Sequence, residues 1–302
     1  MASRAPKPKV GIVGLGIMGG AFAGHLAAAG FEVIGYDVLA AKRAALGARG
    51  GMAAKSPAAV AAIARVVITS LPSVKAFEAA LFGRDGIVGG ARRGAIVIEA
   101  STLPLAVKER AHRQLAERGI TLLDCPISGT GAQAAAKDIA VYASGERSAY
   151  TRCKAIFKGF ARSAYYCGAF GVGSKLKYIA NLLVTIHNVS AAEAFVLAER
   201  AGVDPALMYR VIKDGAGTSR MFEVRGPLMI RRRYLPATMK VDVYQKDIAI
   251  IRAFAAALRA PTPLFNASSR YYAEALRRGY AKRDTAVVHA VLRKAARRGR
   301  RR

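Results

Sequence analysis

The sequence has few of the residues that build metal centres and disulfide frameworks. Three cysteines (Cys125, Cys153 and Cys167) occur in 302 residues, an odd number without CxxC or Cys/His metal spacing. The four histidines are scattered and form no HxH or HExxH motif. The sequence therefore predicts neither a disulfide-stapled fold nor a metal site, and it suits a reducing, cytoplasmic compartment.

Acidic residues are also scarce, with 19 Asp and Glu against 48 Lys and Arg, a formal net charge of +29. Residues 293–302 supply seven of the positive charges and residues 1–10 supply three, with no acid in either segment. Both ends are therefore expected to be solvated, poorly ordered tails. No zinc-finger or aromatic RNA-binding signature accompanies the charge, so it predicts attraction of anions and only nonspecific polyanion binding through the basic tail.

The sequence also has few long, uninterrupted apolar segments. The first thirty residues join a basic head to an apolar run, as a secretory signal does, but Gly14, Gly16, Gly19 and Gly20 interrupt that run. No other segment is expected to span a bilayer, so no membrane partner is predicted. Because 53% of the residues are hydrophobic, the chain is expected to bury sizeable cores and to fold as two domains.

The sequence does contain a glycine-rich turn. The apolar strand KVGIV at residues 9–13 is followed directly by GLGIMG at residues 14–19 and then by a segment of small residues. In such a unit the glycines permit a tight turn, the approach of a pyrophosphate, and close packing of helix on strand, while the helix N-terminus holds the phosphates. The predicted cofactor-binding residues here are Gly14, Leu15, Gly16, Ile17, Met18 and Gly19.

A second strand, residues 31–37, ends in Asp37. A carboxylate at this position accepts hydrogen bonds from the adenosine ribose and repels a 2′-phosphate, so NAD is predicted over NADP. Lys42 and Arg43 lie one turn further on and leave NADP open.

Three more apolar strands, within residues 65–73, 94–102 and 120–129, end in small or polar residues. Alternation of these strands with helical segments predicts an α/β Rossmann-type, doubly wound parallel sheet whose ligands bind beyond the strand C-termini. Each polar turn alone is an ordinary strand-to-helix connection, but three at one sheet edge favour a ligand crevice. The turns contain Leu71, Pro72 and Ser73, Ser101 and Thr102, and Ser128, Gly129, Thr130 and Gly131.

Residues 169–302 are expected to form an all-helical substrate and dimerisation domain that follows the Rossmann domain of residues 1–168 and begins with a long interdomain helix. Helical geometry places Lys175 and Lys177 on opposite sides of that helix. Lys177 shares a narrow polar stripe with Asn181 and Asn188, and the apolar residues Leu176, Ile179, Leu183 and Ile186 are expected to pack elsewhere. The stripe is either the solvated side of the helix or a site in which an amide holds a substrate while an amine takes a proton.

Four motifs together resemble the β-hydroxyacid dehydrogenases, a family that includes 3-hydroxyisobutyrate dehydrogenase, tartronate semialdehyde reductase and L-threonate dehydrogenase. The similarity extends from about Lys9 to Leu292. The motifs are the cofactor turn at residues 14–19, the substrate loop DCPISGTGA at 124–132, the catalytic helix GVGSKLKYIAN at 171–181 and the second lysine motif KDIAII at 246–251.

The resemblance implies a Rossmann domain followed by an all-α domain, a homodimer or homotetramer, and NAD(P)-dependent hydride transfer at the hydroxyl carbon of a small 3-hydroxy acid. It implies that Lys177 is the catalytic lysine and that Asn181 orients the substrate. It further implies that the substrate carboxylate binds Ser128, Gly129 and Thr130, and that the nicotinamide end contacts Thr102 and Lys246. A lysine base needs its pKa lowered from about 10.4, which burial or a nearby positive charge achieves.

Two departures from the family pattern concern substrate choice. Thr130 replaces the usual second glycine of the substrate loop, and Ala180 replaces the first asparagine of many catalytic helices. Residues 217–229 look most like the threonate branch. Two alternatives remain: an imine- or phosphogluconate-type reductase on the same scaffold, and a non-catalytic NAD-binding scaffold whose basic tails bind nucleic acid or a partner. The pair Lys177 and Asn181 argues against the first, and the complete set of site residues argues against the second.

Overall fold

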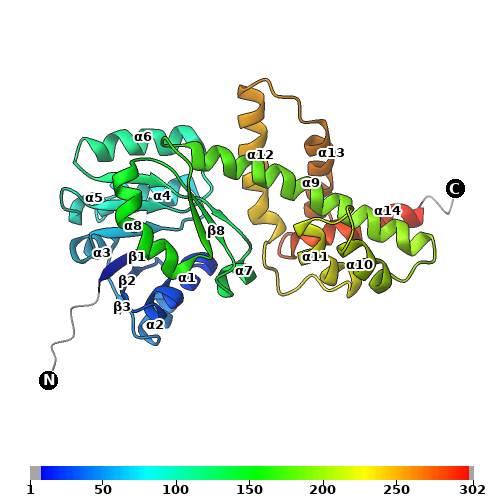
Figure 1. Cartoon of the computed structure of the whole chain (residues 1–302), viewed down its shortest axis with the longest axis horizontal. Helices are drawn as coiled ribbons and strands as arrows, with labels where there is room; N and C mark the ends of the chain where they lie inside the picture. Colours follow the sequence, from blue (N-terminus) through cyan, green and yellow to red (C-terminus); the bar gives the residue numbers. More distant parts are fainter. Residues whose placement is uncertain (1–7, 299–302) are drawn as a thin grey trace. The chain divides into compact units, whose positions relative to one another are not determined.

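The computed structural model describes residues 8–298 and divides the chain into two compact units, residues 1–177 and 178–302 (Figure 1). The sequence places its boundary after residue 168, close to the start of the long helix α9 (Val172–Arg200). This helix begins in the first unit and continues as the first element of the second.

The first unit contains a six-stranded parallel sheet with the strand order β3-β2-β1-β4-β5-β6. The order reverses between β1 and β4, which is where ligands bind in open α/β sheets. The doubly wound α/β prediction is therefore confirmed. The strands are β1 (Lys9–Val13), β2 (Glu32–Tyr36), β3 (Met52–Ala53), β4 (Val66–Thr69), β5 (Ile96–Glu99) and β6 (Thr121–Asp124).

Helices cover both faces of this sheet (Figure 1). Side chains alternate along each strand: on β5, Ile96 and Ile98 pack with α1 and α8, and Val97 packs with α3, α4 and α6. The two-sided burial accounts for the apolar strand sequences. The helices are α1 (Ile17–Ala28), α2 (Ala40–Gly47), α3 (Pro57–Ile63), α4 (Val74–Phe82), α5 (Ile87–Gly90), α6 (Leu105–Ala116), α7 (Gly131–Ala135) and α8 (Arg147–Phe160).

A second, three-stranded sheet is absent from the sequence-based prediction. Strands β7 (Ile127–Ser128) and β8 (Ala140–Ala143) pair antiparallel, and β8 pairs parallel with β9 (Ser163–Tyr166). These strands have two to four residues each and lack a long apolar run, which is why the pattern does not reveal them. Its first strand, β7, lies within the substrate-loop motif and places Ser128 at the end of a strand.

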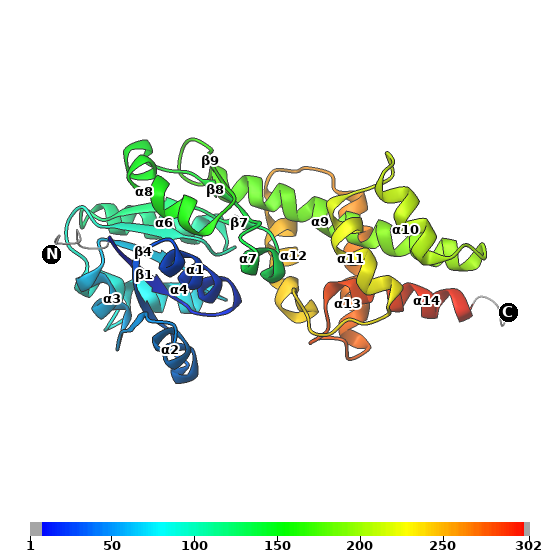
Figure 2. The ribbon, with the colours of Figure 1, turned by 60° about the horizontal axis from the view of Figure 1, so that its bottom comes forward.

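The second unit is helical, as the sequence predicts (Figure 2). Asp204 caps α10 by accepting hydrogen bonds from the N–H groups of Ala206 and Leu207, and Pro205 occupies the first helical position. The elements after α9 are α10 (Pro205–Lys213), α11 (Arg220–Ile230), α12 (Val241–Ala257), α13 (Pro263–Arg277), the 3-10 turn η1 (Thr285–Val287) and α14 (Val288–Arg298).

The two sides of α9 differ from the sequence-based expectation. Lys175 is exposed, as expected, but the polar stripe is buried: Lys177 is 9% exposed, Asn181 6% and Asn188 0%. The interpretation of the stripe as a solvated face is therefore wrong. Asn188 is accommodated because its amide donates hydrogen bonds to the Tyr272 hydroxyl and the Thr285 carbonyl.

The apolar side of α9 is instead open in the single chain. Ile179 is 53% exposed and Leu183 is 46% exposed. The expectation that these residues pack away from the polar stripe is therefore not met within the single chain. Helical periodicity distinguishes two faces but does not say which one a neighbouring element covers.

α9 also corrects the membrane expectation. Among residues 8–298, it is the one helix that is long and apolar enough, by length and composition, to cross a bilayer. Two of its buried polar side chains donate hydrogen bonds inside the helical unit: Thr185 to the Asn181 carbonyl and Asn188 to the Tyr272 hydroxyl. A core helix of a soluble domain has these properties.

The C-terminal basic segment is partly helical. α14 extends to Arg298, and Arg293 Nε donates to Glu199 Oε2 at 2.5 Å. The expectation of a poorly ordered tail is therefore wrong for residues 293–298, which belong to α14, where Arg293 pairs with the Glu199 carboxylate. The remaining parts of the predicted tails, residues 1–7 and 299–302, lie outside the described residues.

Candidate active site

The glycine turn after β1 has the geometry that the sequence predicts. Gly14 has φ +93°, and a Cβ there would lie 2.2 Å from the Ser70 carbonyl oxygen. A Cβ at Gly19 would lie 1.9 Å from the Gly14 oxygen. Neither position accepts a side chain, so the turn is tight and α1 packs directly against it.

The N-terminus of α1 is open to a phosphate. Gly16 caps the helix, is exposed, and would have no atom within 4 Å of an added Cβ. The first turn carries no acidic residue, and Ile17 is 60% exposed. Unpaired N–H groups and the helix dipole at such an end favour an anion, so the site fits a pyrophosphate.

Asp37 follows β2 beside this turn. Its Oδ2 accepts a hydrogen bond from the Leu15 N–H at 2.8 Å, and Oδ1 accepts one from Leu39 N–H at 2.9 Å. Arg43 donates to the Asp37 carbonyl at 2.5 Å and lies over the Tyr36 ring. The carboxylate is thus held in place with lone pairs to spare, and Nη1 of the guanidinium is bound to backbone carbonyls.

A cavity of about 410 Å³ opens beside α1 and α2. Its lining includes the predicted residues Leu15, Gly16 and Ile17, together with Lys42. Lys42 therefore stays available to an anionic group near this end of the unit.

The turns after β4 and β5 meet, as the sequence predicts. Leu71 N–H donates to Ser101 Oγ at 2.8 Å, which joins the two turns directly. Pro72 is exposed and Thr102 is half-buried. The segments expected to contact the cofactor therefore lie along one edge of the sheet, next to the glycine turn.

The substrate loop follows β6. Ser128 is half-buried at the end of β7, and Gly129 has φ +142°. Thr130 is the N-cap of α7: its hydroxyl accepts from Gln133 N–H at 3.4 Å, and its N–H donates to Gln133 Oε1 at 3.0 Å. The Thr130 hydroxyl proton remains able to donate, so the residue that departs from the family pattern both orders the loop and keeps a donor.

Helix α9 carries Lys177 and Asn181 four residues apart, on one face. Asn181 Nδ2 donates to Asp247 Oδ2 at 2.9 Å, and the Asn181 carbonyl accepts from the Tyr244 hydroxyl at 3.0 Å. Lys246 Nζ lies 3.3 Å from Asp247 Oδ1. One carboxylate on α12 therefore orients the amide and pairs with the second predicted lysine.

Asp247 is the residue that the sequence analysis missed. It is 6% exposed and contacts two predicted site residues, Asn181 and Lys246. Its position directly after Lys246 in KDIAII was a signal, because a buried carboxylate beside a lysine is costly unless it is paired.

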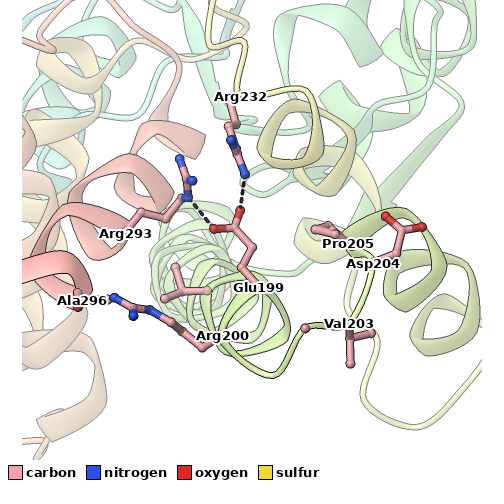
Figure 3. Close-up of a pocket in the computed structure, with 10 residues that line it drawn as sticks. Glu199, Arg200, Val203, Asp204, Pro205, Arg232, Arg293 and Ala296 are labelled. Carbon is pink, nitrogen blue, oxygen red and sulfur yellow. Dashed lines mark hydrogen bonds and ion pairs between the residues drawn. The ribbon is translucent and has the colours of Figure 1, made fainter. Parts of the chain in front are cut away.

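A larger cavity, of about 570 Å³, lies in the helical unit near the C-terminus of α9 (Figure 3). Its charged lining includes Glu199, Arg200, Asp204, Arg232 and Arg293. None of the predicted site residues is among the described residues that line it.

Comparison with known proteins covers nearly the whole chain. Residues 9–168 match the family model of the NAD binding domain of 6-phosphogluconate dehydrogenase. Residues 171–292 match that of the NAD-binding domain of NADP-dependent 3-hydroxyisobutyrate dehydrogenase.

Three individual proteins are informative. The chain is 35% identical to an L-threonate dehydrogenase of Cupriavidus necator, over 92% of this chain and 94% of that protein. A crystal structure of 3-hydroxyisobutyrate dehydrogenase from Salmonella typhimurium matches with a TM-score of 0.86 at 33% identity, covering 94% of this chain and 100% of that one. A Mycobacterium tuberculosis 3-hydroxyisobutyrate dehydrogenase structure with L-serine matches with a TM-score of 0.83 at 26% identity, covering 95% and 100%.

Proposed function

The chain belongs to the β-hydroxyacid dehydrogenase family, and from that premise we propose that it oxidises a small four-carbon hydroxy acid of the threonate type with NAD. It is an oxidoreductase of hydroxy acids with an NAD(P)-binding Rossmann domain. The observation that carries the substrate proposal is the 35% identity, over 92% of this chain, to a protein named L-threonate dehydrogenase.

Lys177 is proposed as the base. In this proposal the substrate hydroxyl donates a hydrogen bond to the neutral Lys177 amine, and the amine takes the O–H proton as the substrate carbon is oxidised to a carbonyl. Bound NAD supplies the hydride acceptor. Asn181 has one amide hydrogen committed to Asp247, which leaves its other hydrogen and its oxygen for the substrate. Support comes from the burial of Lys177 and from the orientation of Asn181.

The substrate carboxylate is assigned to the loop of residues 128–130. Ser128 and Thr130 offer hydroxyl donors, and the loop is ordered by the cap that Thr130 forms with Gln133. Fixing the carboxylate sets the distance from the reacting carbon to the base. Thr102 and Lys246 are assigned to the nicotinamide end, and Leu71 and Pro72 to the cofactor beyond it.

NAD is proposed as the preferred cofactor, because Asp37 lies beside the glycine turn and Arg43 is bound to backbone carbonyls. We propose a cytoplasmic homo-oligomer, in which a partner covers the apolar side of α9 that includes Ile179 and Leu183. Binding of polyanions by the basic tail is nonspecific in this proposal.

The decisive test replaces Lys177 by Ala and measures NADH formation with a panel of hydroxy acids that includes L-threonate, 3-hydroxyisobutyrate and glycerate. Removing the base is expected to lower kcat by about 100-fold or more, with NADH binding retained. The matched control is Lys175→Ala, which removes an exposed lysine two residues away and should leave kcat near wild type.

Wild-type kcat in Lys177→Ala would refute the assignment of the base. Turnover of cyclic imines but of no hydroxy acid in the wild type would favour the imine-reductase alternative. Cofactor binding without turnover of any member of the panel would favour the non-catalytic scaffold.

A further inference from the structure

Three charged side chains are completely buried where strands β5 and β6 end. Glu99 ends β5, Asp124 ends β6 and Lys108 lies on α6, and each is 0% exposed. Lys108 Nζ lies 2.8 Å from Asp124 Oδ1, 2.7 Å from the Ser101 carbonyl oxygen and 3.9 Å from Glu99 Oε1. One ammonium thus joins two carboxylates, although none of the three is a predicted site residue.

The Asp124 carboxylate holds the first turn of α9. Its Oδ2 accepts from Ser174 N–H at 2.7 Å, and its Oδ1 accepts from Ser174 Oγ at 2.8 Å. Ser174 precedes Lys177 by three residues, about one helical turn. A carboxylate at a helix N-terminus is favoured by the helix dipole, so the contact is stabilising as well as directional.

Gly173 lets this turn pack closely against the strands. Its N–H donates to Ser144 Oγ at 3.0 Å, and a Cβ at this position would lie 2.2 Å from the Tyr142 carbonyl oxygen. The backbone at the start of α9 therefore lies directly on the strand ends, three to four residues before Lys177.

The Glu99 carboxylate holds the other side of the site. Its Oε1 accepts from Ser101 N–H at 2.7 Å, and its Oε2 accepts from the Thr69 hydroxyl. Ser101 Oγ in turn accepts from Leu71 N–H at 2.8 Å. The contacts of Asp124 and those of Glu99 are called the two arms of the network. The Glu99 arm fixes the two turns, after β4 and after β5, that are assigned above to the cofactor.

We propose that Lys108, with Glu99 and Asp124, is a positioning network that sets the base Lys177 and the cofactor-contacting turns in register with each other. The inference rests on the proposed role of Lys177. The charge balance supports it: two carboxylates share one lysine out of water, and burial raises the pKa of Glu99. A buried charge that loses its only counter-charge is strongly destabilising, so the lysine is needed to hold both arms.

The test uses one mild variant for each arm. Ser174→Ala keeps the backbone hydrogen bond to Asp124 and removes the hydrogen bond from the Ser174 hydroxyl. Thr69→Val removes the hydroxyl whose hydrogen bond the Glu99 carboxylate accepts. Lys108→Met disrupts both arms together. The matched control is Arg110→Met, which breaks an exposed pair with Glu78 on the same helix α6. The chain has no tryptophan, so tryptophan fluorescence cannot report on folding. The number of folded cofactor sites is instead measured by the fluorescence of bound NADH.

Ser174→Ala is expected to lower kcat per cofactor site by about tenfold, since small misplacements of a reacting group are costly, and to displace the pH profile of kcat. The KM for NAD should change less than twofold. Thr69→Val should show the reverse pattern, with KM for NAD raised and kcat nearly unchanged. Arg110→Met should match wild type in both. Loss of folded protein alone would lower the number of sites without moving the pH profile.

A double variant separates this inference from the proposed function. In a Lys177→Ala background, Ser174→Ala should have no further effect on residual kcat, because its effect passes through the absent amine. If Lys177→Ala is inactive but Ser174→Ala has wild-type kcat and pH profile, the positioning network is refuted while the base stands. If Lys177→Ala itself retains full activity, the proposed function fails first. If Lys108→Met does not fold, the two mild variants decide.

Discussion

At the residue scale, the polar groups of the candidate site are each held by a specific partner. Asn181 is oriented by Asp247, and Asp37 by the Leu15 N–H. Such contacts reduce the orientational freedom that a substrate or cofactor would otherwise have to remove on binding, which is the physical meaning of preorganisation. Each of these contacts can be removed by replacing one side chain, so its contribution can be measured separately.

Asp37 gives a prediction about cofactor choice. Asp37→Asn keeps one oxygen acceptor near the glycine turn but removes the negative charge that repels a 2′-phosphate. The ratio of kcat/KM for NAD to that for NADP is expected to fall by about tenfold, the size of one charge-assisted hydrogen bond. Steady-state kinetics with both cofactors measures it. Arg43→Gln is the comparison variant. Because Arg43 binds the backbone carbonyls of Asp37 and Val38, its replacement is expected to change the NAD to NADP ratio less than Asp37→Asn does. A wild-type enzyme that favours NADP would contradict the role of Asp37.

At the scale of elements, Glu199 joins three helices of the second unit. It lies near the end of α9 and accepts hydrogen bonds from Arg293 of α14 and from Arg232, which follows α11 (Figure 3). His289 Nε2, also on α14, lies 3.6 Å from Glu199 Oε1, and its Nδ1 lies 3.0 Å from the Tyr234 hydroxyl. Within this cavity lining Glu199 pairs with both Arg232 and Arg293, so these contacts serve to hold helix ends together.

The cluster predicts a pH dependence of stability. Burial lowers the pKa of His289 to about 4, below the value of about 6.5 for an unfolded histidine. The unfolded chain therefore binds the proton more tightly, and stability is lost as the pH falls from 6.5 through 4. The loss is expected to reach about 2 to 3 kcal/mol in the free energy of unfolding.

Urea unfolding followed by circular dichroism, from pH 7 to pH 4, measures this loss. His289→Gln should flatten the curve over that range. The same replacement at His187, which is half-buried on α9, is the comparison for exchanging a histidine for a glutamine elsewhere in the second unit. An unaltered curve in His289→Gln would show that His289 is not the titrating group.

At the scale of the whole molecule, the charge of +29 acts on every anion that approaches. A hydroxy-acid substrate is negatively charged, so a basic surface raises its local concentration. The effect is long-range and is therefore sensitive to salt, in contrast to the contacts of the substrate loop.

This field predicts a salt dependence of the kinetics. Raising the salt from 0.01 to 0.1 M shortens the Debye length from about 30 Å to about 10 Å. kcat/KM for the hydroxy acid is expected to fall by about threefold, mainly through KM, with kcat nearly constant. Sodium chloride and sodium sulfate at equal ionic strength should act alike. A much stronger effect of sulfate would indicate competition for the carboxylate site instead of screening.

The sequence by itself determined the features that depend on neighbouring residues. Gly14 and Gly19 could be placed in a tight turn because only glycine accepts φ +93° at the first position and a 1.9 Å approach at the second. The apolar strands predicted the doubly wound sheet, since strand length and burial on both faces are written in the local pattern.

Only the tertiary structure decided which side of α9 is covered, and with it that Asn188 lies inside while Ile179 and Leu183 lie outside. It alone brought Asp247 to Asn181, 66 positions away, and Lys108 to Asp124, 16 positions away. The reason is physical: periodicity fixes the angle between side chains on one helix, whereas partners on different elements meet only through the packing of the folded chain.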